Sequence, residues 1–326
     1  MDLSLSKIST YRTQLMGVAA LLIVLCHANI YPVATSPIIR KLLSFGNAGV
    51  DIFLFLSGVG VFYSLKKGGG RKNLLKWYIK RYHRIFVPYV LMQIPYWSYF
   101  IAIGKFNLAD SLYEFSTLAF WVRHTGMWYI ALLIPLYLLA PFMYDLFCNG
   151  KNIYAFLSIV TLLILCKIPV VSENSLLLNV VANIQFAFVR VVSFILGLSI
   201  AKYIQQGISV NSGLIIAVSL TLWILCRLLE ISSYWCIVPI ILICSIYIID
   251  ALPNSGVLYK FLTLMGILSL EMYLANGYIR YAFIDSPLYS LDTKLFYGHY
   301  FDYFIIFLLS IILSLGVNFL TKKINK

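Results

Sequence analysis

His27 and Asp51 have the side chains of an acid–base pair, and both lie in segments that are otherwise apolar. His27 lies in QLMGVAALLIVLCHANIYP (14–32), and Asp51 lies in GNAGVDIFLFLSGVG (46–60). If these segments cross a membrane in opposite directions, the two side chains lie at similar depth near its outer face. A carboxylate that accepts a hydrogen bond from one imidazole nitrogen makes the other nitrogen a stronger base. The pair predicts base catalysis on a hydroxyl, and the alternative is a structural hydrogen bond between helices.

A basic and aromatic cluster forms the second candidate site, in RKNLLKWYIKRYHRIFVPY (71–89). Arg81 and Arg84 are three residues apart, so on a helix they share one face. Guanidinium groups suit phosphate oxygens, because their donors form a planar fork. Further charges and rings accompany them, namely Lys76, Lys80, His83, Trp77, Tyr78 and Tyr82. The cluster predicts a site for an anionic ligand, and the alternative is a positively charged anchor at the membrane surface.

Several other polar or aromatic residues are weaker candidates. Arg190 and Glu271 are ionisable residues in apolar segments, where either a polar pocket or a buried ion pair is expected. Trp128 and Tyr129 could stack on a sugar, or could belong to an aromatic belt at the membrane interface. The remaining two, His124 and His299, are expected at the surface, where His124 is a candidate contact for an acceptor.

The elements that position these residues are predicted to be membrane-spanning helices. The 326 residues are 61% hydrophobic and 11% charged, whereas soluble domains are about 25% charged. The mean hydropathy is +0.89. The sequence predicts an all-α polytopic membrane protein, with one domain over 1–326 and about ten helices in a single bundle. At about 17 to 25 residues per span, the expected spans lie near 14–31, 50–66, 85–103, 128–147, 153–170, 187–204, 212–229, 234–250, 260–280 and 301–320. Residues 171–186 are either an outer loop or an extension of the sixth helix.

Charge distribution predicts the orientation of the chain. Most of the 25 Lys and Arg residues fall in segments on the side of the N-terminus, which places both termini in the cytoplasm. The net charge of +13 is therefore assigned to cytoplasmic loops and lipid headgroups, not to nucleic acid binding. KKGGGRKN (66–73) is the one obvious flexible hinge. The six cysteines are expected to be buried apolar side chains, because none has CxxC spacing, and no metal site is predicted.

The order of several motifs resembles the acyltransferase 3 family of integral membrane acyltransferases. They are YRTQLMGVAALLIVLCH, GVDIFLFLSG, WYIKRYHRIFVPY, MWYIALLIPLYLLAP, RVVSFILGLSIAKY and ILSLEMYLANGYI, which together extend over nearly the whole chain. The resemblance implies transfer of an acyl group, usually acetyl from acetyl-CoA, to hydroxyls of extracytoplasmic glycans at the bacterial inner membrane. It also implies that His27 is the essential histidine of the first helix, and that Arg81 and Arg84 form an R-x-x-R motif on the CoA side.

Two positions depart from the pattern of the family. Met16 occupies the position where many members have an arginine, and the nearest arginine is Arg12, which is a candidate to replace it. Asn276 stands in YLAN where many members have the histidine of a YLxH motif. Substrate contacts are expected from Arg190, Glu271, Trp128 and Asn276. The sequence contains no appended esterase-like domain, so transfer is expected within the membrane domain.

The resulting functional prediction is a membrane O-acyltransferase with acetyl-CoA as its acyl donor and a glycan or lipid-linked sugar as its acceptor. His27 would activate the hydroxyl, with help from Asp51, and Arg81, Arg84 and Arg12 would bind CoA. The alternative is a transporter or flippase for an anionic glycan or small solute. A third possibility is a membrane scaffold without catalysis.

Overall fold

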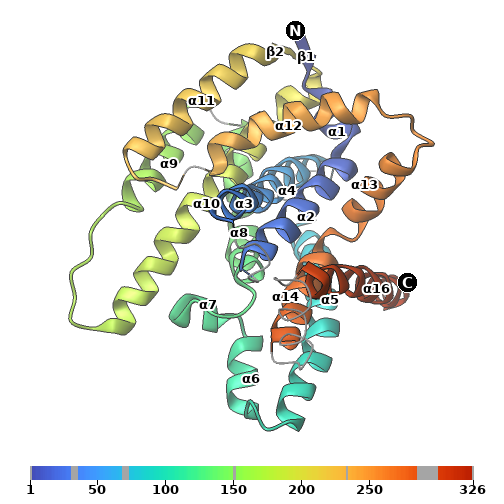
Figure 1. Cartoon of the computed structure of the whole chain (residues 1–326). Coiled ribbons are helices and arrows are strands. Elements are labelled where there is room, and N and C mark those ends of the chain that lie inside the picture. Colours follow the sequence, from blue (N-terminus) through green and yellow to red (C-terminus); the bar gives the residue numbers. More distant parts are fainter. Residues whose placement is uncertain are drawn as a thin grey trace. The chain divides into compact units, whose positions relative to one another are not determined.

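The computed structural model of the chain describes residues 2–30, 36–67, 73–149, 152–232, 234–284 and 300–324. Nearly all of them are helical, and the described strands are β1 (Asp2–Ser4) and β2 (Ser209–Asn211), which pair antiparallel (Figure 1). The predicted all-α class is therefore confirmed. Residues 68–72, the centre of the predicted hinge, and His299 lie outside the described residues.

The helices form two compact units. The first unit contains Met1–Arg12, Asp51–His83 and Asn107–Ala251, and the second contains Thr13–Val50, Arg84–Phe106 and Leu252–Lys326. Three helices have residues in both units, namely α4 (Ala48–Lys67), α5 (Leu74–Ala102) and α2 (Arg12–Ile30), of which only Arg12 belongs to the first unit. The single domain expected over 1–326 stays a prediction.

The first unit is made mainly of the central part of the chain. Besides residues of α4 and α5, it contains α1 (Ser6–Thr10), α6 (Leu108–Phe115), α7 (Leu118–Arg123), α8 (Trp128–Tyr144), the π-helix η3 (Asp145–Asn149), α9 (Asn152–Leu165), α10 (Ser175–Gln206), α11 (Ser212–Leu228) and α12 (Tyr234–Ala251). Residues 171–186 prove to be largely an extension of the sixth predicted helix. This helix, α10, begins where the Asn174 side chain accepts hydrogen bonds from the backbone N–H groups of Leu176 and Leu177.

Helices α4 and α10 approach each other closely within the first unit. A Cβ atom on Gly58 would collide with the carbonyl oxygen of Phe194, and one on Gly197 would collide with that of Phe55. Glycine lets the backbones of membrane helices come into direct contact. This contact lets Asp51 on α4 bond to Arg190 on α10.

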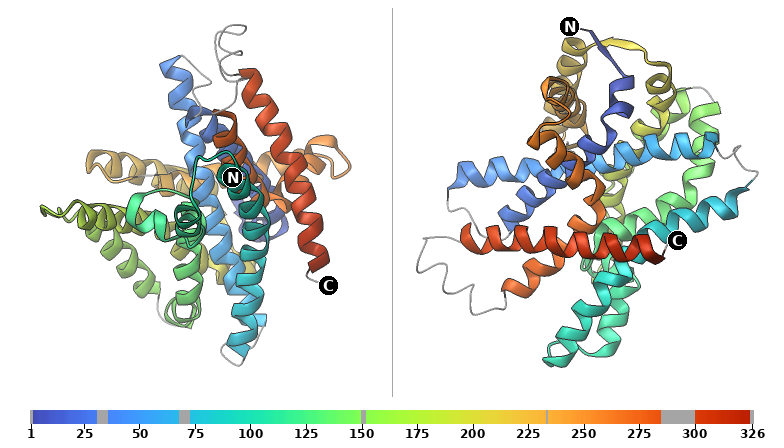
Figure 2. Two further views of the ribbon diagram at one scale, coloured as in Figure 1. Left: turned by 90° about the horizontal axis from the view of Figure 1, so that it is seen from below. Right: turned by 90° about the vertical axis from the view of Figure 1, so that its right-hand side faces the viewer.

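The second unit contains most of α2 (Arg12–Ile30), together with α3 (Pro37–Ser44), the 3₁₀ helix η1 (Phe45–Asn47), α13 (Val257–Ile267), α14 (Ser269–Ile284) and α16 (Tyr300–Ile324). The last two of these helices pack side by side (Figures 1 and 2). A core of seven buried residues joins α2 to the C-terminal helices, namely Val24, Ala28, Met265, Leu268, Met272, Tyr303 and Ile306. The Tyr303 hydroxyl also donates a hydrogen bond to the carbonyl oxygen of Val24. These contacts fix the end of α2 that carries His27.

Seven described helices are long and apolar enough to cross a membrane. Helices α13 and α14 form a pair bent by 76°, which has the length and composition of a broken span or of a re-entrant loop. Two predicted spans are shorter helices, Asn152–Leu165 and Ser212–Leu228. At 1.5 Å per residue, 14 residues extend about 21 Å, less than the roughly 30 Å of a bilayer core. The structure confirms a polytopic helical membrane protein, whereas the count of ten spans is not confirmed.

Candidate functional site

His27 lies in the last turn of α2 and is hydrogen-bonded to Asn276 of α14. The distance from His27 Nδ1 to Asn276 Oδ1 is 2.6 Å. An amide oxygen only accepts hydrogen bonds, so Nδ1 carries the proton and Nε2 carries the lone pair of the neutral imidazole. This tautomer is suited to a base that acts through Nε2.

Asn276 and Arg280 lie four residues apart on α14, and therefore on one face of the helix. Asn276 is 0% exposed and Arg280 is 5% exposed. The guanidinium of Arg280 interacts electrostatically with the imidazole of His27. Arg280 was not among the site residues predicted from the sequence. The available indication was an arginine in the apolar segment SLEMYLANGYIRYAF, one helical turn after Asn276.

Asp51 has different partners from those predicted. Its carboxylate forms a buried ion pair with Arg190, and the Ser193 hydroxyl donates to Asp51 Oδ1 at 2.9 Å. The hydrogen bond of His27 Nδ1 is made with Asn276, which corrects the predicted partner of the imidazole. A catalytic role of Asp51 stays a prediction. Similar depth in the membrane was not enough to predict that Asp51 contacts His27, because depth does not specify which way a side chain points around its helix.

Aromatic rings enclose the guanidinium of Arg190. Its Cζ atom lies 5.6 Å from the ring centre of Trp128, 5.2 Å from that of Phe186 and 5.5 Å from that of Tyr234. Arg190 and Trp128 were both predicted to contact substrate, and the structure does bring them together. Their arrangement is that of a buried charge surrounded by ring faces, which favour a cation. A contact of either residue with substrate stays a prediction.

Arg12 and Arg81 converge on one segment of α4. Nε and Nη2 of Arg12 donate to the carbonyl oxygen of Leu56 at 3.3 and 3.1 Å. Arg81 Nη2 donates to the carbonyl oxygen of Gly60 at 2.9 Å and to Ser64 Oγ at 2.6 Å. A Cβ atom at position 60 would lie 2.5 Å from Arg12 Nη2, so glycine makes room for this guanidinium. Two of the three arginines predicted to bind CoA are thus grouped in the first unit.

Arg84 follows Arg81 by one turn on α5 and is exposed. It interacts electrostatically with Glu271, a buried residue in the first turn of α14. Asn318 Nδ2 donates to Glu271 Oε1 at 2.9 Å. Glu271 therefore has Arg84 and Lys322 as its charged neighbours, and its predicted contact with substrate stays a prediction.

His124 is exposed, as predicted, and has a hydrogen-bond arrangement similar to that of His27. Its Nδ1 atom lies 2.5 Å from Asn183 Oδ1, and Asn183 Nδ2 donates to the carbonyl oxygen of Trp121 at 3.1 Å. His124 ends α7 with a positive φ of 57°. The residue is therefore held in one orientation at the surface of the first unit, where a contact with the acceptor stays a prediction.

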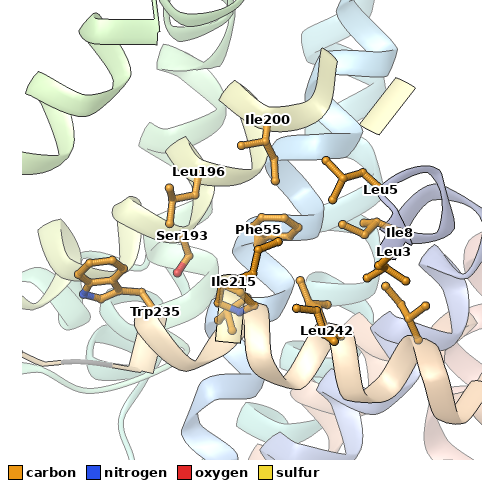
Figure 3. A pocket seen from close by; sticks show the side chains of 14 residues that line it. Leu3, Leu5, Ile8, Phe55, Ser193, Leu196, Ile200, Ile215, Trp235 and Leu242 are labelled. Atoms are coloured by element: carbon orange, nitrogen blue, oxygen red, sulfur yellow. The ribbon is translucent and has the colours of Figure 1, made fainter. Parts of the chain in front are cut away.

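Two cavities among the described residues of the first unit are apolar. One of 220 Å³ is lined by side chains of α1, α4, α10, α11 and α12, with the Ser193 hydroxyl among them (Figure 3). A larger one of 690 Å³ lies mainly among α8, α9 and α10. Neither has an acidic or basic lining residue, so they suit hydrocarbon chains and not proton transfer. In the described part of the chain, no group of three or more His, Cys, Asp or Glu residues is placed to bind a metal.

Comparison with known proteins gives one match. The family model for the acyltransferase domain of the acyltransferase 3 family matches residues 14–323. No curated protein and no solved structure matches the chain. The matched region contains the His27–Asn276 pair, Arg81 and Arg84. Arg12 lies just before this region. The chain, a helical membrane protein, therefore belongs to the acyltransferase 3 family.

Proposed function

We propose that this acyltransferase moves an acetyl group from acetyl-CoA to a hydroxyl of an extracytoplasmic or lipid-linked glycan. The observation that carries this proposal is the hydrogen bond between His27 and Asn276, because it leaves the lone pair of the imidazole on Nε2. A base of this kind activates a hydroxyl by accepting its proton as the oxygen attacks.

The acyl donor is proposed from the charge of its binding residues. CoA carries several phosphate groups, and Arg12, Arg81 and Arg84 supply guanidinium groups that suit phosphate oxygens. The first two of these are anchored to backbone carbonyl oxygens of α4, which fixes their positions before a ligand binds. Exposed lysines on α5, Lys76 and Lys80, add positive charge. An anionic donor is therefore favoured over a neutral one.

The orientation is proposed from the distribution of basic residues. The segments that carry most of the Lys and Arg residues would face the cytoplasm, together with both termini. In this orientation Arg81 and Arg84 lie on the side where CoA is available, and His27 lies toward the outer side of a bacterial inner membrane. The acceptor would then be a glycan that is assembled or modified outside the cytoplasm.

The test is a transfer assay with the purified protein reconstituted in lipid vesicles. Labelled acetyl-CoA is supplied with lipid-linked or polymeric glycans, and both CoA release and labelled glycan are measured. His27→Ala should abolish transfer and leave insertion intact, because base catalysis contributes about 100-fold to 10,000-fold. Leu25→Ala is the matched control, since this exposed side chain lies on the same helix. Normal transfer by a well-folded His27→Ala protein would refute the proposal.

A transport function is the second candidate, and one observation favours it. The pair formed by α13 and α14 is bent by 76°, and discontinuous helices are common in the binding sites of transporters. A transporter would move its labelled glycan or anion across the vesicle membrane without acetyl-CoA. Movement of label with no consumption of acetyl-CoA would support this candidate and exclude the acetyl transfer proposed above.

A further inference from the structure

Three buried hydrogen-bond donors lie on the face of α14 that also carries the partner of His27. They are Nδ2 of Asn276 and the Nε and Nη1 atoms of Arg280. The Asn276 side chain is within reach of the Tyr303 hydroxyl, whereas the two arginine donors have no hydrogen-bond acceptor among the described residues. Both side chains are at least nine-tenths buried, at 0% and 5% exposure. The Arg280 guanidinium contacts the Tyr281 ring, at 4.8 Å from Cζ to the ring centre, and this contact gives Nε and Nη1 no oxygen acceptor.

Donors of this kind are costly to bury without an acceptor, and almost all buried polar groups in proteins have one. A buried cation without a carboxylate partner is more costly still. A ligand that supplies oxygen acceptors would remove both costs. The guanidinium and amide donors together select an oxygen that carries negative charge.

The position of the donors indicates which oxygen they bind. Asn276 accepts from His27 through Oδ1, so its Nδ2 group belongs to the same amide that orients the base. Arg280 is close enough to interact electrostatically with the His27 ring. We infer that Arg280 and the Asn276 amide bind the carbonyl oxygen of the acyl group and stabilise the oxyanion that forms during transfer. This inference rests on the acetyl transfer proposed above.

The reaction step is as follows. The acceptor hydroxyl oxygen forms a bond to the thioester carbon, and its proton moves to His27 Nε2. The electron pair of the C=O bond moves to the carbonyl oxygen, whose charge is held by Arg280 and Asn276. When the C=O bond reforms, the C–S bond breaks, and the CoA thiolate takes the proton from the imidazolium. The products are the acetyl ester and CoA, and no oxidant or further reactant is needed.

Arg280→Gln tests the inference by kinetics. Removal of one donor to an oxyanion typically lowers kcat by about 100-fold to 1,000-fold, and KM for acetyl-CoA should stay close to that of the wild type. Arg227→Gln is the matched control, because it removes the same charge from an exposed position of α11. If Arg280 instead bound an anionic group of the acceptor, KM for the acceptor would rise while kcat was unchanged, and this result would overturn the inference.

A binding experiment separates the role in the transition state from a role in folding. The probe is a CoA thioether that carries a trifluoromethyl ketone, whose hydrate has a tetrahedral carbon like that of the reacting thioester. The wild type should bind it at least 100-fold more tightly than CoA, because enzymes bind mimics of the transition state preferentially. Arg280→Gln should lose most of this preference and bind CoA itself normally. An unchanged preference would overturn the inference.

Two further outcomes are distinguishable. If the wild type neither binds acetyl-CoA nor releases CoA, the proposed function fails, whatever Arg280 does. If Arg280→Gln does not fold, Arg280→Lys replaces it, because lysine keeps the charge and lacks the planar fork of donors. Arg280→Lys should bind CoA normally and have a reduced kcat and a reduced preference for the ketone. Wild-type values for both quantities in Arg280→Lys would overturn the inference.

Discussion

Replacement of Asp51 distinguishes the role predicted from the sequence from the role indicated by the structure. If Asp51 oriented the catalytic histidine, Asp51→Asn would lower transfer and leave stability unchanged. In the structure, Asp51 and Arg190 form a buried ion pair, at 1% and 3% exposure. Removal of one charge from such a pair typically costs about 3–5 kcal/mol, because the other charge is left buried and unpaired. The aromatic rings around Arg190 offset part of this cost, since a cation–π contact removed from water is worth about 2 kcal/mol.

The assay is thermal unfolding of the purified protein in detergent, followed by tryptophan fluorescence. Asp51→Asn should lower the unfolding midpoint by several degrees. The double variant Asp51→Asn/Arg190→Gln should recover much of the loss, because it removes the unpaired charge. Asp110→Asn is the matched control. Its carboxylate is 47% exposed and lies 3.8 Å from Arg123, and exposed pairs of this kind contribute about 0–1 kcal/mol.

One result would refute the structural role. If Asp51→Asn unfolds at the same temperature as the wild type but loses transfer, the ion pair does not stabilise the fold and Asp51 acts in the chemistry. Recovery of the midpoint in the double variant without recovery of transfer would show that stability and catalysis have separate requirements at this pair.

Three further predictions concern the two candidate sites. Asn276→Ala should lower the transfer rate by as much as about 100-fold, because base catalysis contributes at least that factor, and acetyl-CoA affinity should not change. Normal transfer by this variant would contradict the role of Asn276 in orienting His27. Replacement of Arg81 and Arg84 by Gln should weaken acetyl-CoA binding, measured by calorimetry, by about 1.5–3 kcal/mol for each lost charge-assisted contact; equal affinities would contradict the CoA site. Gly60→Ala should displace the guanidinium of Arg12, which lies over this glycine, and weaken acetyl-CoA binding. Gly316→Ala should have no effect, because the added Cβ atom would meet nothing within 4 Å.

The predictable part of the site came from residue types in an unusual setting. His27 is notable in an apolar helix because polar groups are costly there, and Arg81 and Arg84 are notable because their spacing places them on one helix face. The structure places His27 against a hydrogen-bond partner and Arg81 against α4, next to Arg12. Arg84 was predicted together with Arg81, but its charged neighbour Glu271 was assigned to a different group.

The missed part of the site depends on contacts between distant segments. Asn276 was expected to contact substrate, and it proved to be the partner of His27, 249 residues away along the chain. Arg280 drew no attention, since its burial becomes apparent only when α14 packs on its neighbours. The ion pair of Asp51 with Arg190 requires the close approach of α4 and α10 at Gly58 and Gly197.

The sequence by itself determined that this chain is a helical membrane protein, that its order of motifs is that of the acyltransferase 3 family, and that His27 is a candidate base. These features follow from local composition, because a long apolar run must satisfy its backbone hydrogen bonds internally and therefore forms a helix. Only the tertiary structure decided which amide orients His27, which cation neutralises Asp51 and where the unused donors of Arg280 lie. Those choices depend on the rotation and spacing of helices, which are set by side-chain packing between segments far apart in the sequence.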